Sequence, residues 1–566
     1  MTYSYRSRTR TRALLLCGYL ALAALWYWPT RRAGWVTDIL GLLPRLSGDV
    51  GIGGAWTGFG SPVFHPLTLA GHYLLYDLGG AQSLLHYGVW VGLHAATAWL
   101  LAVGLEIALR DAGLSHGRTA GMLAGAVFMV HPYVAEVIVW RATFNYLLCS
   151  PLMLTSAGCA YAYAKTGRPN LLIAVAGATA LALLSFDLAW VAPILVACAA
   201  AAAAPTGRLG GGSLRRVGMA AVVAVCTFAA YLAIKTSVIG TAVGHYGAET
   251  HLRFDLATVL PNAWRSLFKL FFLTREYSFG VKSAYHRFIS ESYVYVPLSV
   301  AGCSALAYWW RVLRRRSARW RLAGWIGIGT LAAIAPTANL FFYWLQRAEG
   351  DRYGYLATAG IAAVLAVGWS AIPRSGLRLA LAVGYLLVLG FFGRRQLRAW
   401  AEGEYAQRLL IANWPLDDHE PAIVLAAADN YRGTYLFRDN TWPYQSVDYN
   451  LRLLGGRAPR DSVLSLVGYN QLTLADSVLA RIDEHGAIEL TFGQWGNWFW
   501  REGIGLTDYR RPGVRVTAGY PAKVCFTRPL APGTALLYPV GTTWARLDAS
   551  TLRRCEAIDS SRAVAK

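Results

Sequence analysis

Charged side chains stand at the ends of several apolar segments of this chain, and they are the residues that could do chemistry. Residues 1–393 contain thirteen Asp and Glu, of which Asp38, Glu136, Asp187 and Asp351 each lie at the end of an apolar segment. Placing a carboxylate there costs free energy unless it is paired or used. Because a carboxylate can take the proton of a hydroxyl group, these positions predict general-base chemistry at a membrane surface.

Cationic side chains accompany these carboxylates. Arg141 follows Glu136 by five positions, and Arg352 follows Asp351 directly. The planar guanidinium group of arginine matches the oxygens of a phosphate, so both arginines are candidate phosphate ligands. Two structural alternatives remain open at this point. The arginines could form ion pairs with neighbouring carboxylates, and the His131-Pro132 step could break a helix.

Other common catalytic motifs are missing from the sequence. It contains no Walker loop, no G-x-S-x-G, no H-E-x-x-H and no C-x-x-C pair, which argues against ATP-driven transport, those hydrolase classes and common zinc sites. Six of the eight cysteines lie in or beside apolar runs. The other two, Cys525 and Cys555, could form a disulfide in an oxidising compartment or remain free.

The composition indicates a multi-span membrane protein. Of the 566 residues, 55% are hydrophobic and only 15% are charged, and the mean hydropathy is +0.36. The net charge of +22 comes largely from short basic clusters between apolar runs, where the positive-inside rule places them, so nucleic-acid binding is not expected.

About eleven segments are long and apolar enough to be predicted as membrane spans. They are 13–28, 85–108, 119–139, 144–164, 170–186, 188–204, 217–240, 293–310, 322–344, 353–371 and 377–393. With a cytoplasmic N-terminus, the inner loops carry 19 Lys and Arg in about 56 positions, and the outer loops carry 12 in about 124. This orientation places eleven of the thirteen acidic residues on the outer side.

The tail has a different character. Residues 394–566 carry 21 basic and 18 acidic residues and no run long enough to span a membrane. Short β-prone segments bounded by Gly, Pro and Asn predict a small β-rich or α+β domain. We therefore expect a multi-span domain over 1–393 and an extracytoplasmic soluble domain over 394–566.

Four polar segments together resemble a known enzyme class. They are FHPLTLAGHYLLYDLGGAQSLLHYGVWVGLHAATAWLL (64–101), HPYVAEVIVWRATFNYLL (131–148), LALLSFDLAWVAP (181–193) and GDRYGYLATAG (350–360). In this order they are similar to the C-type (GT-C) glycosyltransferases related to the transmembrane and tetratricopeptide-repeat O-mannosyltransferases, without the repeats. Members of that class take a sugar from a polyprenyl-phosphate carrier on the outer face of a membrane.

The resemblance implies roles for individual residues. Asp38 stands where the family keeps its catalytic carboxylate, and Glu136 and Asp49 are candidates for binding the acceptor or a metal. The remaining candidates are Arg141, Arg352 and His131 for the donor phosphate, and His65, Asp187 and Asp351 without an assigned role. No cofactor is implied with certainty, a divalent cation is possible, and the metal is unknown. For Asp38, the structural alternative is a helix cap.

The sequence thus predicts an inverting glycosyltransferase of a bacterial inner membrane, which uses a polyprenyl-phosphate sugar donor and membrane lipid. The acceptor, whether glycan, lipid or protein, is unknown. A flippase or transporter for a lipid-linked glycan, or a membrane assembly scaffold, is the alternative function. Residues 253–276 predict an amphipathic helix along the outer surface, and Lys235 is expected to extend towards the membrane surface from within a span.

The predicted orientation can be tested with reporter fusions. Fusions after Gly210 and Arg316 should report a cytoplasmic location, and a fusion after Lys566 should report an extracytoplasmic one, because basic loops stay inside. A cytoplasmic C-terminus would contradict the expected place of the tail.

Overall fold

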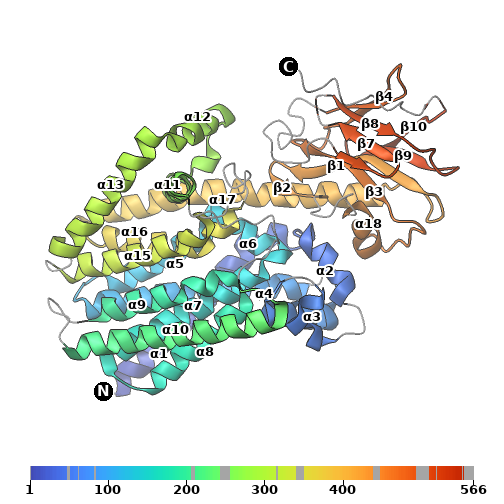
Figure 1. The fold of residues 1–566 in the computed structure, drawn as a ribbon. Helices are drawn as coiled ribbons and strands as arrows, with labels where there is room; N and C mark the ends of the chain where they lie inside the picture. The colour runs from blue at the N-terminus through green and yellow to red at the C-terminus, as the bar shows by residue number, and fades with distance from the viewer. Residues whose placement is uncertain are drawn as a thin grey trace. The chain divides into compact units, whose positions relative to one another are not determined.

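A computed structural model describes residues 2–46, 51–60, 63–81, 84–204, 211–242, 255–313, 317–338, 350–437, 446–492, 509–517, 519, 521–550 and 552. The chain divides into two compact units (Figure 1). Unit 1 comprises Met1–Arg31, Gly48–Val139 and Thr143–Gln396. Unit 2 comprises Arg32–Ser47, Trp140–Ala142 and Leu397–Lys566.

Unit 1 is helical in its described residues. Its helices are α1 (Thr2–Tyr27), α3 (Pro66–Gly79), α4 (Leu84–Asp111), α5 (Gly117–Val130), α6 (Ala135–Val139), α7 (Phe144–Thr166), α8 (Asn170–Ser185), α9 (Ala192–Ala203), α10 (Gly211–Ile239), α11 (Leu256–Phe272), α12 (Phe279–Ser290), α13 (Ser292–Tyr308), α15 (Ala318–Ala338), α16 (Tyr355–Trp369) and the first part of α17 (Ser375–Ala412). Short 3₁₀ turns join several of them, including η1 (Trp28–Thr30), η2 (Ile52–Gly60), η3 (Pro132–Val134), η5 (Asp187–Val191), η7 (Thr274–Glu276) and η10 (Asp351–Gly354).

Five helical segments in the described residues are long and apolar enough to cross a membrane, and a sixth counts if one bent pair forms a single span. The five are Arg10–Thr30, Leu84–Asp111, Arg141–Thr166, Gly212–Ile239 and Ser375–Ala412. Helices overlap all eleven predicted segments, but fewer meet both the length and the hydropathy criteria than the sequence predicts. The chain is therefore a helical membrane-type protein with a smaller number of clear spans.

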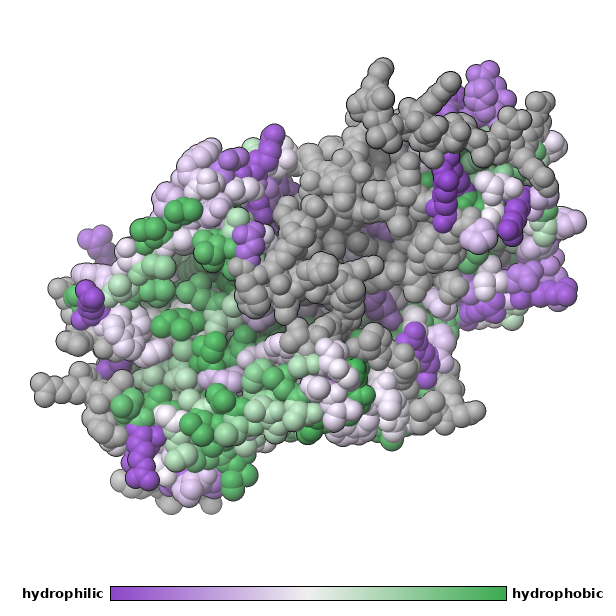
Figure 2. All heavy atoms as spheres, viewed as in Figure 1, coloured by the Kyte–Doolittle hydropathy of each residue, from purple (hydrophilic) through white to green (hydrophobic). Residues whose placement is uncertain are grey.

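Apolar side chains cover the outside of unit 1. Figure 2 shows them gathered on the visible face of α9, α10 and α15. Val222 and Val225 of α10 are more than half exposed, and Ile194 of α9 is close to half exposed. A continuous apolar surface of this kind suits contact with lipid.

The bent pair is α5 with the helical stretch that begins at Pro132. The two helical pieces meet at an angle of 57°. His131 has an extended backbone conformation, and its Nδ1 atom accepts a hydrogen bond of 3.3 Å from the backbone nitrogen of Tyr133. Its Nε2 atom lies 3.3 Å from the carbonyl oxygen of Leu270. The His-Pro step therefore breaks the helix, as the structural alternative proposed.

Unit 2 is rich in strands, which confirms the predicted strand-rich tail. The strands are β1 (Ala422–Tyr431), β2 (Thr434–Tyr435), β3 (Leu464–Gln471), β4 (Leu479–Ile482), β5 (Ile488–Thr491), β6 (Tyr509–Arg511), β7 (Val514–Thr517), β8 (Ala522–Phe526), β9 (Ala535–Val540) and β10 (Thr543–Leu547). In one sheet β1 pairs in parallel with β3 and β9, while β2 pairs antiparallel with β1 and β10 with β9. The other sheet is antiparallel in the order β4-β5-β8-β7-β6.

Unit 2 also includes two stretches from the N-terminal part of the sequence. Its helix α2 (Asp38–Leu46) buries Leu40 and Leu43, and the indole nitrogen of Trp140 donates a hydrogen bond of 3.0 Å to the carbonyl oxygen of Val36. The helix α18 (Ser446–Tyr449) is part of the same unit. The sequence analysis had placed this early segment with the membrane domain.

Two further features bear on the expected boundary at residue 393. Helix α17 continues without interruption to Ala412, so the helix does not end at residue 393, where the sequence changes from apolar to polar. In unit 2, Cys525 of β8 is disulfide-bonded, while its predicted partner Cys555 lies outside the described residues.

Candidate functional site

The residues that the sequence analysis had grouped are divided between the two compact units. Asp38 and Arg141 belong to unit 2, whereas Glu136, Asp351 and Arg352 belong to unit 1. Asp38 is the first residue of α2, where a carboxylate suits the positive end of the helix dipole. Arg141 is 1% exposed, and its backbone nitrogen donates to the carbonyl oxygen of Gly34 at 3.0 Å. Asp49 lies outside the described residues.

Glu136 and Arg352 form a buried ion pair. The guanidinium Nη1 of Arg352 lies 2.7 Å from Oε1 of Glu136, and the backbone nitrogen of Arg352 donates to Oε2 at 2.9 Å. The guanidinium carbon of Arg352 also lies 4.6 Å from the ring centre of Tyr353. Both charged residues are less than a tenth exposed. Sequence analysis proposed separate roles for them, and the alternative that it left open for Arg352 was an ion pair with a neighbouring carboxylate.

Asp351 binds two cationic side chains that the sequence analysis did not propose as site residues. Its carboxylate lies 2.5 Å from Nζ of Lys269 and forms an ion pair with the guanidinium group of Arg275. Asp351 is 1% exposed, so the carboxylate is almost completely removed from water. Burial on this scale is affordable because two cations compensate one carboxylate.

Arg275 links this pair to a wider network. Its backbone nitrogen donates a hydrogen bond of 3.1 Å to the phenolic oxygen of Tyr133. Its guanidinium group donates a hydrogen bond of 3.1 Å to the side-chain oxygen of Gln396. Gln396 in turn donates to Glu276 at 2.9 Å. The network therefore connects η7 with α17 and with the turn that follows His131.

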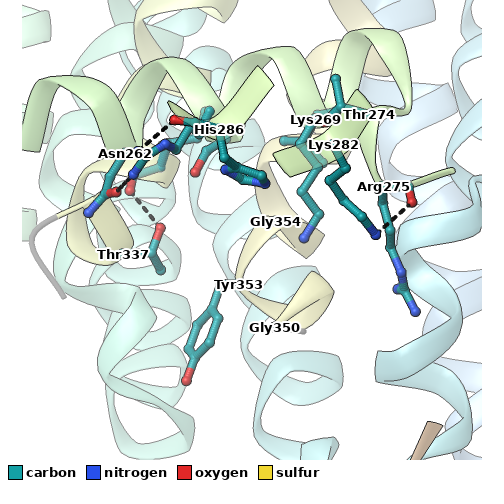
Figure 3. Close-up of a pocket in the computed structure, with 14 residues that line it drawn as sticks. Asn262, Lys269, Thr274, Arg275, Lys282, His286, Thr337, Gly350, Tyr353 and Gly354 are labelled. Atoms are coloured by element: carbon teal, nitrogen blue, oxygen red, sulfur yellow. Dashed lines mark hydrogen bonds between the residues drawn. The ribbon is translucent and has the colours of Figure 1, made fainter. Parts of the chain in front are cut away.

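A hollow beside these pairs is lined by cationic side chains, and we call it the basic hollow. It encloses about 60 Å³. Figure 3 shows Lys269, Lys282 and Arg275 near one another, with Tyr353 and Gly350 opposite them. The residues that line it include Arg265, Lys269, Arg275, Lys282, His286 and Tyr353. Such a surface suits an anionic group, because each cation can donate a charge-assisted hydrogen bond.

Burial weakens the hold of two of these lysines on their protons. Burial and, second to it, the nearby guanidinium group of Arg275 lower the pKa of Lys282 to about 8 and that of Lys269 to about 7. An anion in the hollow would favour the charged form of each lysine. Binding of an anion should therefore depend on pH in the neutral to alkaline range.

A second charged cluster lies elsewhere in unit 1. Nζ of Lys235 lies 2.9 Å from both carboxylate oxygens of Asp187, and the hydroxyl group of Tyr231 donates to the same carboxylate at 2.8 Å. Nε2 of His65 is 3.7 Å from it. Lys235 is 2% exposed, so the expectation that it extends to the membrane surface is wrong. The partly buried carboxylate of Asp187 offers Lys235 a direct partner within the protein.

Sequence analysis missed the basic hollow for an identifiable reason. The amphipathic segment 253–276, which contains Arg265 and Lys269, was expected to lie along the outer membrane surface and seat the lipid carrier or the acceptor, or else to pack against the tail. The relevant signal was the succession of four cations within 18 residues, from Arg265 to Lys282, beside an acidic island far away in sequence. That island contains Asp351.

Neither a metal-binding group in the described residues nor a similar known protein identifies the function of the chain. Within the described residues, no group of three or more His, Cys, Asp and Glu is placed to hold a metal ion. No protein-family model matches the chain, and no curated protein matches it significantly.

The basic hollow predicts pH-dependent anion binding. Sulfate is a suitable probe because its charge is constant from pH 6.5 to 9.5, whereas Lys269 and Lys282 lose their charge in this range. The affinity for sulfate should fall roughly tenfold as the pH rises, which titration calorimetry on the purified protein would measure. Lys282→Gln should bind sulfate more weakly at pH 6.5 and show a flatter pH profile. A wild-type affinity that is constant with pH would contradict this prediction.

The Asp187 cluster predicts an asymmetric effect on stability. Lys235→Met leaves a carboxylate without its main cation and should destabilise the protein by about 3–5 kcal/mol. Adding Asp187→Asn should recover most of this loss, and thermal unfolding in detergent would measure both variants. Lys165→Met is the matched control, because the side chain of Lys165 is 38% exposed whereas that of Lys235 is 2% exposed, so its ion pair with Asp111 should contribute little. Equal stability of Lys235→Met and the wild type would show that the pair is not structural.

Proposed function

We propose that this chain is a membrane glycosyltransferase, which moves a sugar from a polyprenyl-phosphate-linked donor to an extracytoplasmic acceptor. The observation that carries the proposal is the basic hollow, where Lys269, Arg275 and Lys282 converge from two helices and a turn. The four polar segments that resemble C-type glycosyltransferases support it. We assign the protein to this class, with about eleven spans in a GT-C-like arrangement.

The hollow suits the leaving group of such a reaction. When the bond between the sugar and the phosphate breaks, negative charge builds up on the departing lipid phosphate. Preorganised cations stabilise that charge more strongly in the transition state than in the bound donor, which lowers the barrier. In this proposal Lys269, Lys282 and Arg275 hold the phosphate, and the Glu136 carboxylate fixes the position of Arg352 beside them.

The base of the reaction remains Asp38, by the resemblance. Its carboxylate would take the proton of the acceptor hydroxyl, and the resemblance implies a reaction that inverts the configuration at the sugar. Glu136 was also a candidate for the acceptor or a divalent cation. Since its two oxygens bind Arg352, we assign it to the donor side.

Extracytoplasmic placement of unit 2 is part of the proposal. The disulfide of Cys525 supports it, because disulfides persist mainly in oxidising compartments such as the bacterial periplasm. The bacterial inner membrane and the acceptor remain proposals of the same kind.

A transporter of lipid-linked glycan is the second candidate, and one observation favours it. Lys235 of the apolar helix α10 forms an ion pair with Asp187, and ionisable groups inside a membrane bundle often line a transport path. Surface glycans would separate the two functions. If the protein is a transferase, deleting the gene should remove one sugar from a glycan or glycoprotein in mass spectra. Glycans that keep every sugar after the deletion would argue against transfer.

The proposed base gives the sharpest test of the enzyme hypothesis. Asp38→Asn keeps the shape of the side chain and an oxygen for the helix start, but it cannot accept a proton at neutral pH. Transfer should fall by about 10²-fold or more with normal protein abundance, measured as sugar transfer in membranes that contain the variant. Asp77→Asn, an exposed acidic residue of α3, is the matched control and should keep its activity.

Full activity in Asp38→Asn would refute the base assignment. The capping role of Asp38 would then be sufficient to explain its position at the start of α2.

A further inference from the structure

The charges around the basic hollow are only partly compensated. Lys269 and Arg275 share the carboxylate of Asp351. Arg265 and Lys282 have no carboxylate partner among the residues that the structure describes. Their hydrogen bonds go to neutral oxygens, which leave their charges in place. The charge of Glu276 acts on Lys282 without direct contact, so both cations can still form an ion pair with a ligand.

Arg265 is held firmly at its end of the hollow. Its guanidinium group donates to the side-chain oxygen of Asn262 at 3.0 Å, to the carbonyl oxygen of His286 at 3.1 Å and to the hydroxyl group of Ser290. Its Nε atom is buried and makes no hydrogen bond with any described residue. A buried donor without an acceptor is costly, so a bound oxygen would be stabilised there.

Lys282 stands at the other end. Its Nζ atom donates to the carbonyl oxygen of Arg275 at 3.2 Å, which leaves two of its three N–H donors for other acceptors. Figure 3 shows Lys282 with Lys269 and Arg275 on one side of the hollow, while Asn262 and His286 lie on the other side. We call the side with Lys269, Arg275 and Lys282 the lysine end. The side with Asn262, to which Arg265 is hydrogen-bonded, is the asparagine end.

The two ends are spaced along one helix. Arg265 and Lys269 are four residues apart on α11, so they lie on the same face with their Cβ atoms about 6 Å apart. The long side chains at these two positions can contact different phosphoryl groups of one diphosphate. One phosphoryl group can therefore reach the cations of the lysine end while the next reaches Arg265.

We propose that the basic hollow binds a diphosphate, with one phosphoryl group at each end, and that the sugar donor is linked to its lipid through this diphosphate. This inference rests on the proposed function and narrows its substrate class. A sugar linked through a single phosphate brings one negative charge, whereas a sugar linked through a diphosphate brings two. Two charges match the two uncompensated cations, Arg265 and Lys282.

Sugar transfer from such a donor breaks one bond and forms one bond. The bond between the sugar C1 atom and the diphosphate oxygen breaks, and its electron pair stays with the lipid diphosphate. A bond forms between C1 and the acceptor oxygen, whose proton passes to the base. The departing diphosphate gains one negative charge, which Arg265 and the lysine end receive.

Binding of inorganic phosphate and inorganic pyrophosphate to the full-length protein in detergent tests the proposal. Titration calorimetry at pH 7 should give pyrophosphate an affinity at least about tenfold above that of phosphate, with one pyrophosphate bound per chain. Arg265→Gln should lower the pyrophosphate affinity towards that of phosphate while the phosphate affinity changes less than about twofold. Lys282→Gln should weaken both ligands, and Lys165→Gln, with an exposed lysine distant in sequence, should change neither.

The outcomes separate this inference from the proposed function. Equal wild-type affinities for the two ions, or two independent phosphates per chain with no gain for pyrophosphate, would overturn the diphosphate assignment and leave a phosphate site intact. Binding of neither ion at millimolar concentration would overturn both proposals. The wild-type comparison decides the question even if Arg265→Gln does not fold, and Arg265→Lys, which keeps the charge, should then retain the preference for pyrophosphate.

Discussion

The carboxylate of Asp351, buried between Lys269 and Arg275, is the interaction on which the cationic region of unit 1 depends. Several like charges within a small volume repel one another and would separate without a shared counter-charge. Asp351 supplies that charge from η10, and the neighbouring Arg352 is fixed by Glu136 from α6. Three parts of the chain that are distant in sequence are therefore held together by electrostatics, and the hollow forms where their compensation is incomplete.

The two charged clusters of unit 1 illustrate different uses of burial. In the Asp187 cluster, Lys235, Tyr231 and His65 surround one carboxylate, so the charges are nearly balanced and the cluster suits a structural role. In the basic hollow, the cations outnumber the carboxylates that contact them. An excess of one sign in a partly dry space provides binding energy for a ligand of the opposite sign.

The sequence alone could predict the elements but not the partners. Hydropathy located the helices, and alternation with turn residues located the strands of the tail, because both depend on local patterns. Glu136 and Arg352 were both chosen as site residues, yet their 216-residue separation hid their pairing. The polar second half of α17 was assigned to the soluble tail because hydropathy falls after residue 393, whereas helix formation needs only good helix formers. The place of Asp38 in unit 2 depends on tertiary packing, on which its local sequence carries no information.

The order of Asp187 and Lys235 along the chain has a consequence for how the protein is made. A lysine within the most apolar of the long helices opposes insertion of that helix into a bilayer as long as its charge is bare. Asp187 is synthesised 48 residues earlier, so its carboxylate has left the ribosome before Lys235 does. The N-terminal helices thus supply the counter-ion in advance, and a truncation or rearrangement that reverses this order would present the insertion machinery with an uncompensated ammonium group.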